Sequence, residues 1–265
     1  MVSVVGDVGV RADVETALGG QPTVVFHLAA RTSVLGSLRD PEGVYAVNVA
    51  ATQQLLEGAR QAGTRHVVLA STNAVVGDVG RDLIDEETPL RPLTPYGATK
   101  AAAEMLASAY TASFELAVAA VRLTNVYGPG MAKKDTFVVR LLRAAASGRS
   151  VSVYGDGHQE RDYLFIDDAV TAFLLAWERD LTGPITIGAG RSASVLELVE
   201  LAEAVTGRRI PVEHVPAPAG EMLAVRVDIA RARAAGYEPL VQIPEGLTRT
   251  WEDLQRSPAA TVHER

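Results

Sequence analysis

The sequence predicts an α/β fold, a doubly wound parallel sheet with a smaller α/β lobe beside it. The first observation is that short, wholly apolar runs alternate with longer amphipathic stretches. Runs of this kind are typical of parallel strands that helices cover on both faces. The second observation is that the alternation stops after Gly128-Pro129-Gly130, where shorter elements separated by turns begin. The chain is therefore expected to have two parts.

The individual elements follow from apolar periodicity and from start and stop signals. In the first part, strands are expected at Thr23–Ala30, His66–Ser71 and Leu116–Leu123, and helices at residues 41–63 and 95–114. In the second part we expect a helix at 135–146, strands at 150–155 and 161–166, a helix from Asp167, a helix begun by the capping box Ser194-Val195-Leu196-Glu197, a proline-rich connector at 211–218 and a last helix at 244–254.

Composition argues against several classes of function. The 265 residues carry a net charge of −7 with both signs dispersed, so we expect neither nucleic acid nor a membrane surface as partner. The absence of cysteine excludes disulfides, thiolate nucleophiles and cysteine-bound metals, and we expect no metal site. Because the chain shows no secretion signal and no membrane-spanning apolar run, a cytoplasmic location is expected.

Residues 2–12 resemble a dinucleotide-binding turn in sequence. An apolar strand is expected at residues 2–5, followed by Gly6-Asp7-Val8-Gly9-Val10-Arg11-Ala12 and a helix. Glycines at this spacing let the backbone approach a pyrophosphate, but such a turn also needs an acidic residue after the second strand. That strand ends in Ala29-Ala30-Arg31 instead. Arg31 would suit a 2′-phosphate, and the alternative is an ordinary surface turn.

The strongest chemical signal lies in STNAVVGD at 71–78 and PLTPYGATKAAAE at 92–104. Tyr96 and Lys100 are four residues apart on a helix introduced by a proline, so both side chains lie on one helix face. An ammonium beside a phenol lowers the pKa of the phenol, which makes Tyr96 a candidate general base. Thr72, at the end of the preceding strand, would orient a substrate oxygen. The alternative is a chance pair of solvated side chains, because this spacing is common.

Further stretches fall in a recognisable order: GDV at 6–8, VVFHLAARTSV at 24–34, NVAATQQLLEGAR at 48–60, YGATK at 96–100, VRLTNVYGPG at 121–130, VYGDGHQERDYLFIDDAV at 153–170 and EGLTRTWEDL at 245–254. With STNAVVGD, they resemble the extended short-chain dehydrogenase/reductase family, in particular its NAD-dependent nucleotide-sugar epimerase/dehydratase branch and the UDP-glucose 4-epimerase type. Each stretch alone is weak evidence, but together they extend from residue 6 almost to the end.

The resemblance implies a Rossmann-like fold and changes the interpretation of the N-terminus. In the family, a GDV stretch follows the third strand, so Asp7 and Val8 match positions that meet the adenine ring of NAD. The Gly-rich turn would belong about 50 residues upstream, and the Rossmann-like domain is expected to be N-terminally truncated. The strand at 23–30 would then lack its usual neighbour. We therefore expect the chain as given to bind NAD weakly.

The resemblance also assigns roles to single residues. Thr72, Tyr96 and Lys100 match the catalytic positions, and the last two also contact the cofactor. The remaining positions assigned to NAD are Asp7, Val8, Leu28, Ala29, Ala30 and Asn48. The positions assigned to substrate are Asn73, Asn125, Tyr154, Arg161 and Glu221, with Asn125 and Arg161 at the diphosphate.

Several of these residues also have a purely structural interpretation. Asn48 would only bond backbone inside a helix, and Arg161 would only pair with Asp162. Leu28–Ala30 would form a packed strand end, and Tyr154 would only terminate a strand. His27 is expected to be a core histidine with its hydrogen bonds satisfied.

Three departures from the family pattern bear on function. The dehydratases of the branch carry Asp-Glu after the threonine, where this chain has Asn73 and Ala74, so a 4,6-dehydratase is not expected. Ala219 stands where an arginine often clamps the diphosphate, and Val76 stands where a tyrosine is usual near the sugar.

The resemblance therefore implies a NAD-dependent C4 epimerase of a UDP-hexose that works through a transient 4-keto sugar. Alternatives are a related oxidoreductase or decarboxylase, or a non-catalytic remnant that binds sugar nucleotide or a partner chain. Residues 1–128, with 164–190 returning to them, are expected to form the NAD-binding domain. Residues 129–163 and 191–265 would form the substrate-binding lobe. A homodimer is expected by analogy, through the helices at 41–63 and 95–114.

Overall fold

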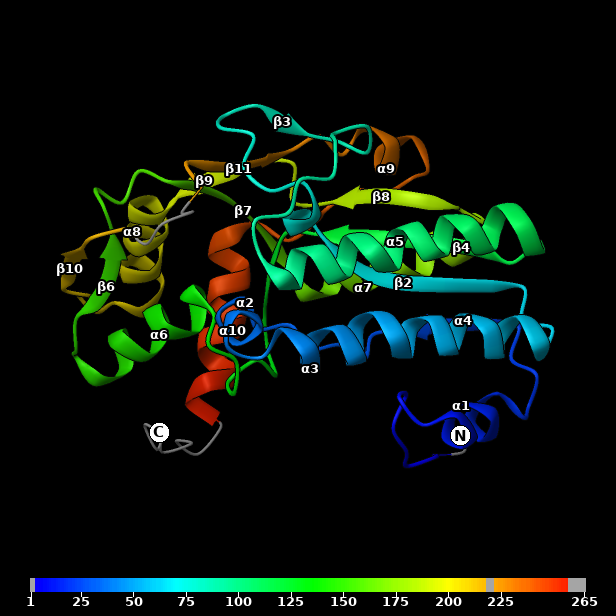
Figure 1. Cartoon of the computed structure of the whole chain (residues 1–265). Helices are drawn as coiled ribbons and strands as arrows, with labels where there is room; N and C mark the ends of the chain where they lie inside the picture. Colours follow the sequence, from blue (N-terminus) through cyan, green and yellow to red (C-terminus); the bar gives the residue numbers. More distant parts are fainter. Residues whose placement is uncertain (1–2, 218–221, 257–265) are drawn as a thin grey trace.

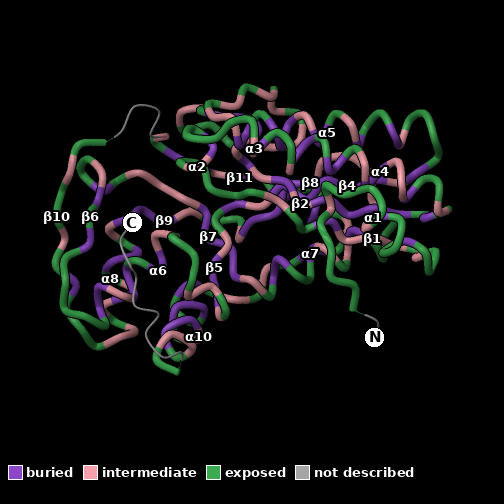
Figure 2. Tube along the Cα trace, turned by 60° about the horizontal axis from the view of Figure 1, so that its bottom comes forward, coloured by how far each residue is buried: buried purple, intermediate pink, exposed green. Residues whose placement is uncertain are grey.

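A four-stranded parallel sheet forms the centre of the computed structural model, which describes residues 3–217 and 222–256 (Figure 1). Its order is β1-β2-β4-β8, with bounds β1 Val24–His27, β2 His66–Thr72, β4 Ala117–Leu123 and β8 Gly183–Ile187. The three strands expected from apolar runs are confirmed. Figure 2 shows β2 and β4 as largely buried, because helices cover both faces of the sheet.

Helices pack on the two faces as an alternating apolar pattern requires. On one face, α1 (Arg11–Leu18), α4 (Ala51–Gln61) and α5 (Pro95–Phe114) share a core with the odd-numbered Val67 and Leu69 of β2. On the other face, α7 (Ile166–Glu178) shares a core with the even-numbered Val68. In the described parts of the chain, no helix combines the length and apolarity needed to cross a membrane.

The helix expected at 41–63 is a composite. It runs from α3 (Pro41–Tyr45) through a π-helical turn, η1 (Ala46–Ala50), into α4, and α2 (Val34–Arg39) precedes it. The helix expected at 95–114 is α5 itself. Its start is stabilised because the Thr94 side chain accepts a hydrogen bond from the backbone N–H of Gly97 at 3.2 Å.

A second group of elements lies partly beside the sheet and its helices and partly above them (Figure 1). It comprises β3 Leu83–Ile84, β5 Asn125–Tyr127, α6 Phe137–Ser147, β6 Val151–Tyr154, β7 Glu160–Phe165, β9 Ser192–Ser194, α8 Val195–Thr206, β10 Val212–Val215, β11 Ala224–Val227, α9 Ala230–Ala234 and α10 Ile243–Arg256. Strands β3, β11, β7 and β5 form one sheet, with β9 antiparallel to β7. The helix predicted from the capping box begins at α8, where both reciprocal hydrogen bonds are present.

Two expectations about elements are wrong. The proline-rich stretch 211–218 is not only a connector, because β10 within it pairs in parallel with β6. Residues 3–5 form no strand, and the side chain of Val5 is 99% exposed, so this stretch has no sheet to pack against. Within the described residues β1 pairs with β2 alone and lies at the edge of its sheet.

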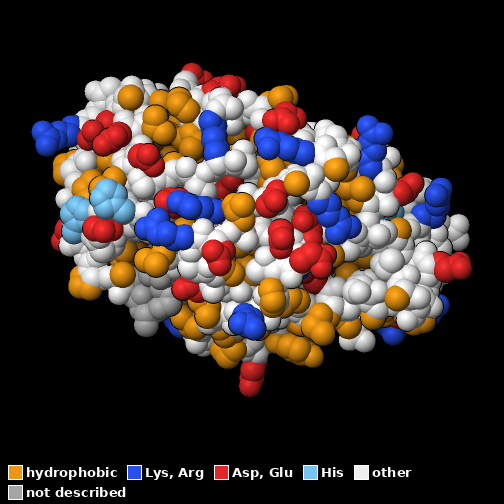
Figure 3. Space-filling view, turned by 90° about the horizontal axis from the view of Figure 1, so that it is seen from above, with side chains coloured by type: hydrophobic (Ala, Val, Ile, Leu, Met, Phe, Trp, Pro, Cys, Tyr) orange, Lys and Arg blue, Asp and Glu red, His pale blue; other side chains and the backbone are white. Residues whose placement is uncertain are grey.

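The described buried side chains form three clusters, and both groups of elements contribute to one of them. One core joins α6, α8 and α10 around Tyr127 and Phe165, and another lies between the parallel sheet and α7. Residues 224–237 contribute Val225, Ile229 and Tyr237 to the second of these cores, although the expected division gave them to the substrate lobe. The division into two domains stays a prediction. On the face that carries β3 and β11, acidic and basic side chains lie interspersed (Figure 3).

Candidate active site

The catalytic candidates meet at the carboxyl edge of the parallel sheet. Strand β2 ends at Thr72, and α5 begins with Pro95 and brings Tyr96 and Lys100 against this strand end. The close approach depends on Gly97, since a Cβ there would lie 2.5 Å from the carbonyl oxygen of Ala74. The sequence YG thus places a buried tyrosine directly beside the turn that follows the threonine.

Tyr96 and Thr72 interact through their hydroxyl groups. Burial raises the pKa of Tyr96 above its usual value of 10.0, and the hydrogen bond with the Thr72 side chain acts in the opposite direction. The net shift of the Tyr96 pKa is therefore upward, opposite to the lowering expected from the sequence. The phenol is 9% exposed, so removal of its ionised form from water outweighs the favourable contact.

Lys100 is buried beside the same strand end. Its Nζ donates a hydrogen bond to the carbonyl oxygen of Ala70 at 2.9 Å. Burial lowers the pKa of Lys100 from 10.5 to about 8, and the carboxylate of Glu104 opposes this shift. An ammonium group has three hydrogens to donate, and the described residues accept one of them. A ligand at this edge can therefore be held by Lys100.

Asn48 fixes the loop that follows β1. Its side-chain oxygen accepts from the backbone N–H of Arg31 at 2.8 Å, and its amide donates to the Arg31 carbonyl at 3.0 Å and to Thr99 Oγ1 at 3.1 Å. The π-helical turn carries this buried side chain, and such turns are frequent at functional sites. Because both amide hydrogens are used within the protein, the structure favours the alternative in which Asn48 bonds backbone.

His27 is a core histidine, as expected. Its ring Nε2 lies 3.0 Å from Thr52 Oγ1, and the Thr52 hydroxyl donates in turn to the Asn48 carbonyl at 2.8 Å. Burial, followed by the charge of Lys100, lowers the pKa of His27 to about 4. The imidazole is therefore neutral near pH 7.

The other positions assigned to the cofactor lie in two places. Leu28–Ala30 follow β1 at the carboxyl edge, where the side chain of Leu28 is 61% exposed. Asp7 and Val8 lie against α4, because the carbonyl oxygen of Val8 accepts a hydrogen bond from Gln54 at 3.1 Å. Asp7 itself caps the turn before α1 through the backbone N–H of Gly9.

Three of the substrate candidates line one cleft of about 690 Å³, as expected for a shared ligand. They are Asn125, Tyr154 and Arg161. Asn125 lies two residues beyond Leu123, which is the register partner of Thr72 at the carboxyl edge of the sheet. Glu221 and Ala219 fall outside the described residues.

Sequence reasoning missed the basic residues of this cleft. Lys133, Lys134 and Arg140 also line it, and an ion pair at 3.5 Å joins Arg140 to Asp135. The two adjacent lysines shortly before the helix cap at Thr136 were the available signal. With Arg161, they give the cleft a surplus of positive charge, as recognition of a diphosphate requires.

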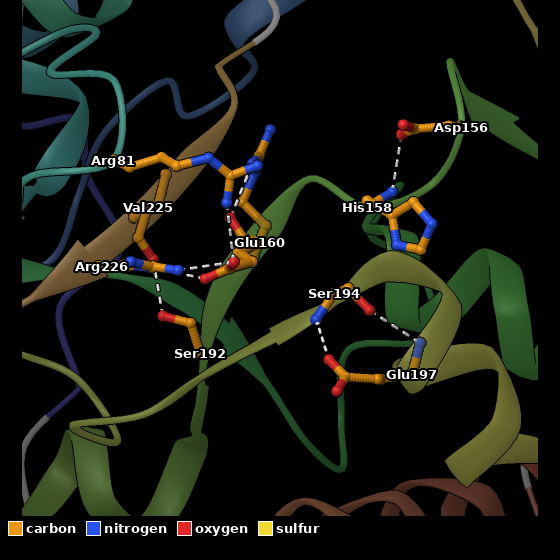
Figure 4. A network of polar contacts seen from close by, with 10 residues as sticks. Arg81, Asp156, His158, Glu160, Ser192, Ser194, Glu197, Val225 and Arg226 are labelled. Carbon is orange, nitrogen blue, oxygen red and sulfur yellow. Dashed lines mark hydrogen bonds and ion pairs between the residues drawn. The ribbon is translucent and has the colours of Figure 1, made fainter.

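Anchored neighbours on β7 hold Arg161 in position. Glu160 contacts the guanidinium groups of Arg81 and Arg226, the latter in two hydrogen bonds of 2.6 and 2.7 Å (Figure 4). Asp162, which is fully buried, accepts hydrogen bonds from Thr124 and from the backbone of residues 189 and 191. The Asp162 carboxylate is thus committed to the opposite side of the strand, which does not support its pairing with Arg161.

The two departures that follow Thr72, the candidate catalytic threonine, are both buried. Asn73 is 9% exposed at the start of a 3-10 turn, η2 (Asn73–Val75), and Val76 is 1% exposed. Asn73 does not line the cleft that holds Asn125, Tyr154 and Arg161.

The chain is similar to known proteins over most of its length. A family model described as the NAD dependent epimerase/dehydratase family matches residues 3–188. The UDP-glucose 4-epimerase of Mycolicibacterium smegmatis is 35% identical over 237 residues, which cover 88% of this chain and 76% of that protein. The dTDP-glucose 4,6-dehydratase of Streptomyces griseus is 36% identical over 245 residues, covering 91% and 74%. The UDP-glucose 4-epimerase of Thermus thermophilus, solved in complex with NAD, matches with a TM-score of 0.90 at 30% identity, covering 96% and 84%.

Proposed function

The chain belongs to the NAD-dependent epimerase/dehydratase family, and from this premise we propose that it epimerises a nucleotide sugar, at C4 of a UDP-hexose. The observation that carries the proposal is the contact of the half-buried Thr72 with the buried Tyr96, with Lys100 one helical turn away. This arrangement lies at the carboxyl edge of the sheet, where open α/β folds bind ligands. The cation-lined cleft includes Asn125, two residues beyond the end of β4, and suits the diphosphate of the substrate.

The residues at this edge fit NAD. Lys100 would hold the nicotinamide ribose with its remaining donors, and the exposed Leu28 with Ala29 and Ala30 would lie under the ribose and phosphates. Asn48 would act through the Arg31 loop that it fixes. We retain Asp7 and Val8 for the adenine ring. When bound, NAD supplies a hydride acceptor and donor for one carbon of the sugar.

The residues of the chain supply the proton chemistry. Tyr96 accepts the proton of the sugar hydroxyl while Thr72 holds the oxygen. Lys100, as an ammonium ion, stabilises the phenolate that burial otherwise disfavours. The 4-keto sugar then turns over beside Tyr96, and Tyr96 returns the proton to the oxygen when the opposite configuration forms. Asn125, Tyr154 and Arg161 would keep the nucleotide end bound throughout.

A dehydratase is the second function that the comparisons suggest, since relatives from two Streptomyces species carry that name. That reaction needs a proton donor and acceptor at the departing hydroxyl. Asn73 and Ala74 stand where the dehydratases of this branch carry Asp-Glu, and neither an amide nor a methyl group can exchange a proton there. This chemistry favours the epimerase. An oxidoreductase or decarboxylase acting on the same sugar nucleotides, or a non-catalytic binding protein, would be the alternative.

Tyr96→Phe is the decisive variant. It removes one hydroxyl from a buried ring, so the fold should persist, and turnover of UDP-glucose to UDP-galactose should fall by roughly 10²–10⁴-fold. Thr72→Val should reduce turnover less, because it removes an orienting hydrogen bond and not the proton acceptor. The measurement is product formation with added NAD, together with transient cofactor reduction followed by absorbance.

Tyr110→Phe provides the matched control. Tyr110 lies on the same helix, and its hydroxyl bonds Glu57 at 3.3 Å, away from the carboxyl edge. Its loss should leave turnover unchanged. Parental turnover in Tyr96→Phe would remove the phenol from the mechanism and with it the proposal. Binding of UDP-glucose without turnover in the parent protein would instead support the non-catalytic alternative.

We also propose a homodimer and a cytoplasmic location. The dimer would form through the composite helix at 41–61 and α5, where Tyr45 and Met105 are exposed. Sedimentation at several protein concentrations would measure the oligomeric state directly.

A further inference from the structure

A buried ionic cluster lies directly behind the lysine of the candidate site, and the proposed mechanism does not use it. Glu104 follows Lys100 by one helical turn, as Lys100 follows Tyr96, so that the three side chains form one buried stripe of α5. The stripe faces β2 and β4. There Ser71 and Arg122, which are register partners on the two strands, both contact the Glu104 carboxylate.

The geometry of this cluster is tightly determined. Nε of Arg122 donates to both oxygens of Glu104 at 3.1 Å, and Nη2 donates to Oε2 at 2.8 Å. The remaining guanidinium nitrogen of Arg122, Nη1, donates to the carbonyl oxygens of Asp85 and Glu86. The two charged side chains are 3% and 6% exposed. A pair buried in this way adds little net stability over apolar side chains of equal volume, so stability is a poor reason for its presence.

We propose that Glu104 is a positioning residue whose carboxylate, fixed by Arg122 and Ser71, keeps Lys100 an ammonium ion beside Tyr96. This inference rests on the proposed function, because the charge of Lys100 matters when Tyr96 must lose a proton. The proposed chemical role is specific: Glu104 touches neither substrate nor cofactor and acts through Lys100.

The charged and titratable groups that face Lys100 support this role. His27 approaches from β1 and is neutral near pH 7, since its pKa is about 4. Tyr96 and Glu104 flank Lys100 on α5, and Arg122 reaches the cluster from β4 with a positive charge. Burial lowers the pKa of Lys100 to about 8, and Glu104 is the group that raises it. Without that carboxylate, Lys100 would face only neutral groups and a cation.

The test is a direct titration of Lys100. The chain contains three lysines, Lys100, Lys133 and Lys134, so ¹³Cε-lysine labelling yields a simple NMR spectrum. A Lys100→Ala sample assigns the buried resonance, and the two exposed lysines serve as internal references. The Lys100 midpoint should lie near pH 8 in the parent. In Glu104→Gln it should fall by about one pH unit, the size of one charge–charge interaction.

Two further variants separate charge from structure. Ser71→Ala removes a hydrogen bond from the cluster and keeps the carboxylate, so the Lys100 midpoint should stay at its parental value. Glu104→Asp keeps the charge and should restore most of the parental midpoint. If Glu104→Gln does not fold, Glu104→Leu with Arg122→Met removes both buried charges, and the midpoint should fall by less than in Glu104→Gln, because loss of the Arg122 cation offsets part of the loss of the carboxylate. An unchanged midpoint in a folded variant without the carboxylate overturns the inference.

An activity profile distinguishes this inference from the proposed function. In Glu104→Gln the alkaline limb of the turnover–pH profile should move to lower pH by the same amount as the Lys100 midpoint. A midpoint that moves in a protein without epimerase activity would refute the proposed function and leave the effect of Glu104 on Lys100 in place. A moved midpoint with an unmoved alkaline limb would refute the role of that effect in catalysis.

Discussion

Arg161 lies on β7 between two anchored neighbours, with Glu160 bound to Arg81 and Arg226, and Asp162 buried. Such anchoring positions a guanidinium group at the cleft wall before a ligand arrives. Preorganisation of this kind reduces the entropy cost of binding an anion. The lysines opposite are exposed and supply charge with less positional precision.

We predict that Arg161→Ala weakens binding of UDP-glucose by about 2 kcal/mol, roughly 30-fold, because charge-assisted hydrogen bonds to the diphosphate are lost. Binding of free glucose should be unaffected. Calorimetric titration measures both. Arg149→Ala, an exposed arginine in the turn after α6, is the control and should bind like the parent. Equal affinity of Arg161→Ala and parent for UDP-glucose would show that Arg161 does not contact the diphosphate.

Among the helices and strands, the start of α5 is the element that supplies two of the three catalytic candidates, Tyr96 and Lys100. The helix can approach the turn after β2 only because position 97 has no side chain. The backbone N–H of the same residue also donates to the capping side chain of Thr94. Gly97 therefore takes part in the helix cap, allows the close approach to the turn, and so determines the position of Tyr96. A small displacement here would change the distance between the phenol and Thr72.

Gly97→Ala should therefore lower the free energy of unfolding by about 1–3 kcal/mol, as overpacking does, although alanine is the better helix former. Turnover should fall as well, because the shifted helix moves Tyr96 away from Thr72. Chemical denaturation and the epimerase assay measure the two effects. In Gly20→Ala the new methyl group meets no atom within 4 Å, so this control should change neither. Parental stability in Gly97→Ala would contradict the close approach to Ala74.

For the whole molecule, the buried histidines link stability to pH. Burial lowers the pKa of His27 from 6.5 to about 4, and it also lowers the pKa of His66. Below pH 6.5 the unfolded chain binds a proton on His27, whereas the folded protein does so only near pH 4. The stability that the neutral His27 contributes is therefore fully present above pH 6.5, and it is lost as the pH falls toward 4.

We predict that the slope of unfolding free energy against pH between 4 and 6.5 is smaller in His27→Gln than in the parent. A shift of this size corresponds to about 3 kcal/mol across the window. Urea denaturation at a series of pH values measures the slope, and His158→Gln, at an exposed position, is the control. The interpretation fails when the His27→Gln and parental slopes coincide.

The sequence alone determined the features that local chemistry encodes. Wholly apolar runs identified β1, β2 and β4, and proline and the capping box marked the starts of α5 and α8. The spacing of Tyr96 and Lys100, with Thr72 at a strand end, identified the catalytic candidates. These features depend on side-chain period and on backbone caps, which neighbouring residues establish by themselves.

The tertiary structure decided what depends on packing between distant segments. It joined Glu104 to Arg122 and Ser71, placed Lys133 and Lys134 in the cleft of Asn125, Tyr154 and Arg161, and paired β10 with β6. It also set the direction of the Tyr96 pKa, because burial outweighed the charge that the sequence had suggested. Desolvation and long-range ion pairs depend on which surfaces the fold buries together, and a local pattern carries no record of that.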